Sequence, residues 1–283
     1  MNTPLQSDKV LDYKWAETNI AEDGIAIIRN ATGFPVRDYA FVTNQMVVNI
    51  CNSGTAHALY DSRNVYIEQD EIAVVMPNHI IRPVETSDDY CITQMIVDRP
   101  ILDLLKQRLS RRNYLKYYDT PACKITKEQK GTLLKIVEII ESALGEPIPY
   151  KQEQITNLLD VFFTLLEQYN PQRAEESHAD QLYRRFCELV AENFRTSRNI
   201  TYYAQKLQLS PKYFTRLISR STGVKPSDFI SDYVTIQAKQ LLLSRPDISL
   251  QAAAEALGFP DQASFSRFFK RQAGITPKDF RKN

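Results

Sequence analysis

The 283-residue sequence predicts an α+β fold: an N-terminal antiparallel β-barrel with following helices, then an all-α part containing two helix-turn-helix units joined by a linker helix. Short apolar, β-branched runs recur up to residue 97, which is typical of strands. The apolar period becomes helical from residue 101, and residues 200–281 contain one two-helix pattern twice. We therefore expect two domains, residues 1–170 and 178–283, joined by a linker at residues 171–177.

Six short runs are predicted as strands because apolar and β-branched residues lie between turn signals. The runs are Ile25–Ile28, Met46–Ile50, His57–Tyr60, Val65–Ile67, Ile72–Met76 and Tyr90–Val97. Several short, closely spaced strands indicate a small antiparallel barrel or sandwich. A barrel of this size can enclose a small molecule, so a small-molecule ligand is one expected partner.

Three amphipathic helices are predicted after the strands, over residues 101–118, 127–144 and 152–169. The third has a wide apolar face, which must be buried either inside the chain or against a second copy. The candidates for a homodimer interface on this helix are Ile155, Leu158, Phe162 and Leu166. The polar segment that follows has no apolar period and contains Pro171, so it is predicted as the linker.

The C-terminal part repeats a short helix, a tight turn, a second helix, a glycine and a proline. Ile200–Leu207 and Leu250–Leu257 both place apolar or small residues at i, i+3, i+4 and i+7. Ser210 and Asp261 are suitable N-caps for the second helices. The two copies match at Phe214 and Phe265, Arg216 and Arg267, Arg220 and Arg271, Gly223 and Gly274, and Pro226 and Pro277. Each copy therefore has the pattern of a helix-turn-helix.

The segment between the two units, Ser227–Arg245, is predicted as one helix. Its length is roughly 28 Å at about 1.5 Å per residue. That length is close to the roughly 34 Å between successive major-groove sites on one face of B-DNA. One chain could therefore place two helices in neighbouring segments of the major groove.

The run from Ile200 to Arg281 resembles the DNA-binding domain of the AraC/XylS regulators. The resemblance is strongest over Leu257–Pro277, where a Gly-Phe turn precedes a Phe-Ser-Arg-x-Phe-Lys helix and a Gly-x-x-Pro stop. One departure is Val234, at the place where many members have an arginine in the linker helix. The resemblance implies a sequence-specific DNA-binding transcription regulator, with double-stranded DNA as its partner and RNA polymerase as a candidate partner.

Positions in the matching motif imply which side chains face DNA. The expected base contacts are Lys212, Thr215, Arg216, Gln262, Ala263, Ser264, Ser266 and Arg267. The expected phosphate contacts, one or more turns further on, are Ser219, Arg220, Lys270 and Arg271. Arginine, lysine, glutamine, serine and threonine side chains can hydrogen-bond to base edges or phosphates. An internal salt bridge is the alternative role for Arg216 and Arg267, because they occupy equivalent places in both copies.

The passage Asp70–Pro77 resembles the strand-to-turn passage of a cupin-like jelly roll, which precedes the DNA-binding domain in many AraC-type proteins. The resemblance implies a domain that binds an effector or dimerises. Metal-dependent cupins use a His-x-His pair, a Glu and a later His, whereas this stretch offers only His57 and His79. We therefore expect no metal, no cofactor and no catalytic residue, although a cupin-type enzyme fused to a DNA-binding module is an alternative.

Basic residues are concentrated at the C-terminal end. Residues 181–283 contain 17 Lys/Arg and 8 Asp/Glu, a net charge of +9, whereas residues 1–180 carry −8. A basic part beside an acidic remainder fits a DNA-binding module joined to a different kind of domain. A helical protein–protein adaptor is an alternative, and so is a helical solenoid, although solenoids usually have three or more repeats.

The sequence also predicts a cytoplasmic location. We find no signal-peptide pattern at the N-terminus and no apolar run near the roughly 20 residues of a membrane span. The four cysteines lack Cys-x-x-Cys spacing, which favours reduced thiols. They are Cys51, Cys91, Cys123 and Cys187.

Overall fold

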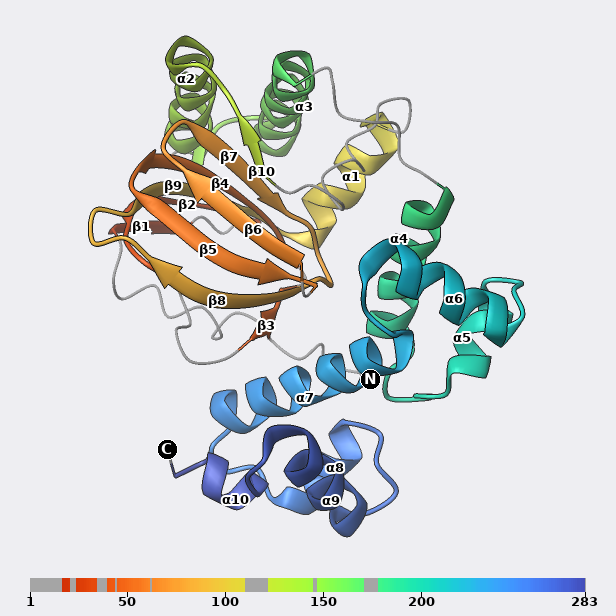
Figure 1. Cartoon of the computed structure of the whole chain (residues 1–283). Helices are drawn as coiled ribbons and strands as arrows, with labels where there is room; N and C mark the ends of the chain where they lie inside the picture. Colours follow the sequence, from red (N-terminus) through yellow and green to blue (C-terminus); the bar gives the residue numbers. More distant parts are fainter. Residues whose placement is uncertain are drawn as a thin grey trace.

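The computed structural model describes residues 17–20, 24–34, 40–43, 45–61, 63–109, 122–144, 147–170 and 178–282. Two antiparallel sheets and three helices form the N-terminal part, and helices alone form the C-terminal part (Figure 1). The predicted α+β class is therefore confirmed. The predicted linker, residues 171–177, lies outside the described residues.

Every strand pair in the two sheets is antiparallel. The six-stranded sheet has the order β1 (Glu17–Ile20), β2 (Ile25–Ala31), β9 (Cys91–Val97), β4 (Met46–Ser53), β7 (Glu71–Val75) and β10 (Ala122–Lys124). The four-stranded sheet has the order β3 (Phe41–Val42), β8 (Ile80–Thr86), β5 (Thr55–Tyr60) and β6 (Arg63–Glu68). The strand pairs of the described residues leave two separate sheets, so the predicted barrel is observed as a two-layered arrangement.

All six predicted strand runs coincide with strands of the structure, and β1, β3, β8 and β10 were not predicted. The strand β8 contains Pro83, which has no N–H to donate to a neighbouring strand. Pro83 pairs with Ala58 at the point where the register between β5 and β8 shifts. A proline in a strand at a register shift explains why the sequence pattern gave no strand there.

The six-stranded sheet is buried on both faces. In β4, Met46 and Val48 belong to a hydrophobic core shared with the helices, whereas Val47 and Cys51 belong to the core that faces the other sheet. This alternation follows from the two-residue period of a strand. Burial on both faces also explains why these strands are apolar almost throughout.

Three helices cover the outer face of the six-stranded sheet: α1 (Arg99–Leu109), α2 (Lys127–Leu144) and α3 (Lys151–Tyr169) (Figure 1). The bounds of α2 are those predicted, and α3 begins one residue earlier. The helix predicted over residues 101–118 is seen as far as Leu109, and its remainder lies outside the described residues.

The proposed dimer contacts on α3 require a correction. Ile155, Phe162 and Leu166 have an exposed fraction of 0% in the single chain, because they pack against the sheet and the neighbouring helices. They are therefore internal core residues, whereas Leu158 is only partly buried. A wide apolar face predicts that this helix is buried, but it does not distinguish burial inside the chain from burial against a second copy.

The C-terminal part consists of seven helices in two groups around a central one. The first group is α4 (His178–Asn193), α5 (Ile200–Lys206) and α6 (Pro211–Thr222), and the second is α8 (Leu250–Ala256), α9 (Gln262–Ala273) and α10 (Pro277–Phe280). The helix α7 (Pro226–Ser244) lies between the groups (Figure 1). It packs on α6 and on α9, so the predicted linker helix is present as one 19-residue element.

The N-terminal and C-terminal parts contact each other directly. Ala40, Val42 and Ile80 belong to the same hydrophobic cluster as the C-terminal helices. The side chain of Gln240 on α7 donates a hydrogen bond of 3.0 Å to the carbonyl of Val42 on β3. Helix α7 thus connects both helix-turn-helix units and the N-terminal sheets. Among the described residues, we find no helix long and apolar enough to cross a membrane.

Candidate nucleic-acid interface

Local sequence signals begin and end the second helix of each unit. The hydroxyl of Ser210 accepts a hydrogen bond of 3.3 Å from the Tyr213 N–H, and the Asp261 carboxylate accepts one of 2.6 Å from the Ser264 N–H. The hydrogen bond from the Ser264 backbone lowers the pKa of the Asp261 carboxyl below its ordinary value. Gly223 and Gly274 end the two helices with φ of 76° and 78°. Glycine adopts this left-handed conformation at little cost.

Each of these helices, α6 and α9, buries one face in the core and exposes the other to solvent. In α6, Phe214 and Ile218 are buried four residues apart, and in α9 Phe265 and Phe269 have the same spacing. Residues four apart lie on one face of a helix. The opposite faces carry the polar candidates of the sequence analysis, so burial orients both polar faces outward.

Most of the predicted DNA-contacting residues are exposed. The exposed ones are Lys212, Arg216, Arg220, Gln262, Ala263, Arg267, Lys270 and Arg271. The partly exposed ones are Thr215, Ser219, Ser264 and Ser266. Ser219 differs from the others because its hydroxyl oxygen is inaccessible to solvent. The structure thus does not present the Ser219 hydroxyl to a phosphate.

The two equivalent arginines are not part of an ion pair among the described residues. The guanidinium of Arg267 lies 3.5 Å from the Ser264 hydroxyl, and its charge acts on the nearby Asp261 carboxylate. The guanidinium of Arg216 lies 5.6 Å from the centre of the Tyr213 ring. These contacts are within their own helices or caps, so the side chains remain available to DNA. Base contact by Arg216 and Arg267 stays a prediction.

The structure also shows a contact between the two units that the sequence did not suggest. The guanidinium of Arg198 stacks 3.7 Å from the centre of the Phe259 ring and donates a hydrogen bond of 2.6 Å to the Leu257 carbonyl. Burial lowers the pKa of Arg198 from its ordinary value. Arg198, which lies just before α5, therefore packs against the turn between α8 and α9.

The linker helix is buried along much of its length. Val234, at the position where the resembling family often has an arginine, has an exposed fraction of 0%. It packs among the aromatic and aliphatic side chains of the C-terminal core. An apolar residue fits this position because an unpaired charge would be costly there.

A second candidate site lies between the two sheets. This cavity of about 70 Å³ is enclosed by residues of both sheets, including Val47, Val75 and Ile81. The side chain of Gln94 donates a hydrogen bond of 2.8 Å to Asn49, while its own carbonyl oxygen is buried without a hydrogen-bond partner. A water needs about 10–15 Å³ of such volume, so the cavity holds roughly five waters or a small ligand.

The two N-terminal histidines lie in different environments. The Nε2 atom of His57 lies 2.7 Å from the Asn64 side chain, and the ring stacks on Tyr66. His79 is fully buried and is hydrogen-bonded to Asp61. The two histidines therefore do not form a cupin-type metal site with each other. The four cysteines are free thiols.

Comparisons with known proteins find a domain family and several named regulators. A family model described as a helix-turn-helix domain matches residues 203–283. The Msm operon regulatory protein of Streptococcus mutans is 26% identical over 130 residues, which are 45% of this chain and 46% of that protein. The arabinose operon regulatory protein of Escherichia coli K12 is 30% identical over 148 residues, 51% of this chain and 49% of the relative. The chain thus spans less than half the length of these curated relatives.

The fold of the whole chain is similar to a solved structure. An apo form of ToxT from Vibrio cholerae strain SCE256 aligns with a TM-score of 0.50 over 94% of this chain and 98% of its own. The two sequences are 14% identical, so this similarity concerns the fold alone. It extends over both the N-terminal sheets and the C-terminal helices.

Proposed function

We propose that this chain is a sequence-specific DNA-binding transcription regulator of the AraC/XylS type, which its similarity to a helix-turn-helix domain and to named operon regulators supports. The observation that carries the proposal is the pair of exposed polar faces on α6 and α9, held by one buried linker helix. Residues 178–283 bind duplex DNA, and residues 1–170 bind an effector or a second copy. RNA polymerase is the partner through which a regulator of this kind would act.

The two helix-turn-helix units divide the DNA site between them. Lys212, Thr215 and Arg216 of α6 contact one group of bases, and residues Gln262 to Arg267 of α9 contact another. Arginine suits guanine O6 and N7, and glutamine suits adenine N6 and N7. Arg220, Lys270 and Arg271 bind phosphates, which fixes the register of the helices on the duplex.

The cavity between the sheets is the proposed effector site. Its lining is apolar except for a few polar groups, of which the Gln94 carbonyl oxygen accepts no hydrogen bond from the described residues. Small-molecule sites commonly combine an apolar wall with a few such polar groups. The effector should therefore be small, largely apolar and able to donate a hydrogen bond. Catalysis is not part of the proposal, since the relatives are named as regulators.

Binding of the full-length chain to genomic DNA fragments, measured across a range of salt concentrations, tests the proposal. Lys and Arg displace condensed counterions from DNA, so affinity should fall by about 10³-fold or more between low and physiological salt if six or more phosphates are contacted. Adding a metabolite extract should change the affinity for selected fragments. A folded chain that binds no duplex at any salt concentration would instead favour the protein–protein adaptor.

Dimerisation is a further part of the proposal, through the outer face of α3. Leu158, Val161 and Leu165 lie at i, i+3 and i+7 and remain partly or fully exposed. Val161 has an exposed fraction of 49%, and Ile139 on the neighbouring α2 has one of 54%. Exposed apolar side chains on two adjacent helices are suited to a symmetric contact with a second copy.

The substitution Val161→Asp is expected to dissociate the homodimer, because it places a charge in an apolar contact between two chains. Sedimentation at micromolar concentration would show a shift from dimer to monomer. The control is Gln152→Asp, which adds the same charge at an exposed position elsewhere on α3. A wild-type chain that sediments as a monomer would rule out this interface.

A further inference from the structure

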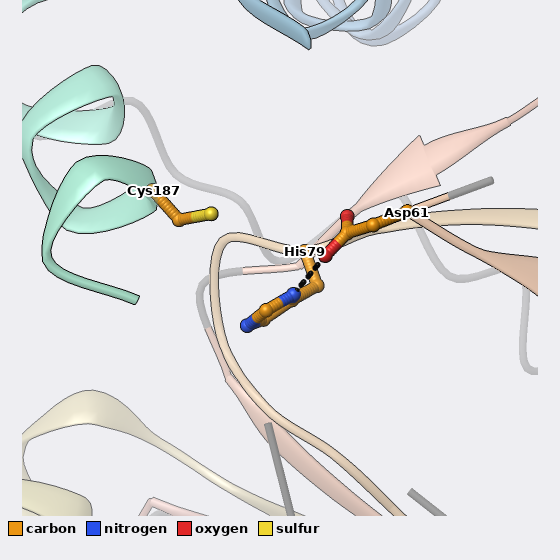
Figure 2. Close-up of side chains that lie close together, drawn as sticks. All are labelled: Asp61, His79 and Cys187. Carbon is orange, nitrogen blue, oxygen red and sulfur yellow. Dashed lines mark hydrogen bonds and ion pairs between the residues drawn. The ribbon is translucent and has the colours of Figure 1, made fainter. Parts of the chain in front are cut away.

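Three side chains with metal-binding groups meet where the N-terminal and C-terminal parts join (Figure 2). Asp61 follows β5, His79 precedes β8, and Cys187 lies on α4. One ligand atom from each residue lies within 4.8 Å of the others. The exposed fractions are 3% for Asp61, 0% for His79 and 1% for Cys187. The cluster is thus built from both parts and sealed from solvent.

The orientation of these groups is fixed by their neighbours. The Nδ1 atom of His79 is hydrogen-bonded to Oδ2 of Asp61, and Oδ1 of Asp61 accepts a hydrogen bond of 2.8 Å from the Ile80 N–H. The ring of His79 stacks on Tyr60 at 4.7 Å and meets the edge of Tyr183 at 6.2 Å. Outer groups that orient ligating side chains, here the Ile80 N–H and the Tyr60 ring, contribute strongly to metal affinity.

The donor set is chemically specific. An imidazole nitrogen, a carboxylate oxygen and a thiolate sulfur suit a borderline-soft divalent ion such as Zn²⁺, whereas Mg²⁺ and Ca²⁺ prefer oxygen ligands alone. Zn²⁺ usually takes four ligands. Tyr183, one helical turn before Cys187 on α4, lies close enough to interact with both Asp61 and Cys187. Its hydroxyl or a water can occupy the fourth position.

The charge balance of the cluster also suits a cation. Two acidic side chains, those of Asp61 and Glu188, act electrostatically on Cys187. In Figure 2 the sulfur of Cys187 points toward the Asp61–His79 pair. A bound divalent ion would offset the negative charges of the carboxylate and of a thiolate in this buried place.

We propose that Asp61, His79 and Cys187 form a binding site for a divalent transition-metal ion of the Zn²⁺ type. Because Asp61 and His79 belong to the N-terminal part and Cys187 to α4, the bound ion joins the sheets to the C-terminal helices. The ion thereby stabilises the arrangement in which α7 lies against the edge of the four-stranded sheet. The competing interpretation is a metal-free hydrogen-bonded pair beside an unreactive thiol.

Metal content of the full-length chain tests the proposal. The purified protein is stripped with a chelator, exposed to Zn²⁺ or Co²⁺ and dialysed. Wild type should retain about one ion per chain, and the Co²⁺ form should show the absorption of a thiolate bound to cobalt. Cys187→Ala should abolish that absorption and weaken affinity by about 100-fold or more, since outer-shell partners alone contribute 10–100-fold.

Controls separate loss of the site from loss of the fold. Cys123→Ala removes another buried cysteine, on β10, and should retain the metal. His79→Asn should lose the metal, and Zn²⁺ should raise the melting temperature of the wild type and of Cys123→Ala but not of Cys187→Ala. Wild-type protein without metal, or cobalt absorption that persists in Cys187→Ala, would overturn the proposal. These measurements use no DNA, so their outcome does not depend on the proposed regulator function.

Discussion

Gly258→Ala is expected to destabilise the C-terminal helices by about 3 kcal/mol or more. Gly258 lies in the turn of the second unit with φ of 74°, and an added Cβ atom would lie 2.0 Å from the backbone oxygen of Arg195. The substitution thus combines left-handed backbone strain with a clash against another segment's backbone. Thermal and urea unfolding of the full-length protein would measure the loss, and DNA binding should fall with it.

Gly274→Ala provides the matched control for Gly258→Ala. Gly274 has a φ of 78°, but an added Cβ atom there would have no neighbour within 4 Å. Only the strain of a left-handed alanine then remains, which is about 1–2 kcal/mol. Equal losses of stability in the two variants would contradict the close approach between Gly258 and Arg195.

Arg267→Ala is expected to relax base preference in one part of the DNA site, at a cost of about 1–3 kcal/mol, while the other part stays unchanged. The reason is that Arg267 is exposed on α9, and α7 separates α9 from α6. Arg216→Ala on α6 should relax the other part. Competition between DNA sites that carry single base changes would measure both preferences.

Arg271→Ala is the control for these two substitutions. If Arg271 binds a phosphate, its loss should weaken binding to all sequences about equally and reduce the salt slope by about one. The internal-salt-bridge alternative predicts that Arg216→Ala and Arg267→Ala lower the melting temperature and weaken binding to every sequence. Unchanged base preferences with lowered melting temperatures would therefore show that these arginines are structural.

Local signals made the C-terminal helices predictable from the sequence. Ser210 and Asp261 cap the N-termini of α6 and α9, and Gly223 and Gly274 end the two helices. The hydrogen bonds of these caps join residues that are close together in the sequence. The exposed polar faces follow from the same helical period. The strand β8 was not predicted because Pro83 interrupts its pattern, and its place depends on pairing with distant β5.

Contacts between distant segments could not be predicted. The apolar period of α3 shows which residues avoid water, but it is the same whether they face the sheet or a second chain. Phe162 is therefore a candidate for a dimer interface by its sequence pattern, although it lies in the core. The contact of Arg198 with Phe259, and the meeting of His79 with Cys187, likewise join segments that are far apart in the sequence.

The most direct measurement is selection of DNA sites from a randomised duplex library by the full-length protein. The 19 residues of α7 span about 28 Å, close to one turn of B-DNA. The selected sites should therefore contain two short base clusters whose centres lie about 10 base pairs apart. A single cluster would contradict the division of the site between α6 and α9. No enrichment at either low or physiological salt would contradict sequence-specific DNA binding itself.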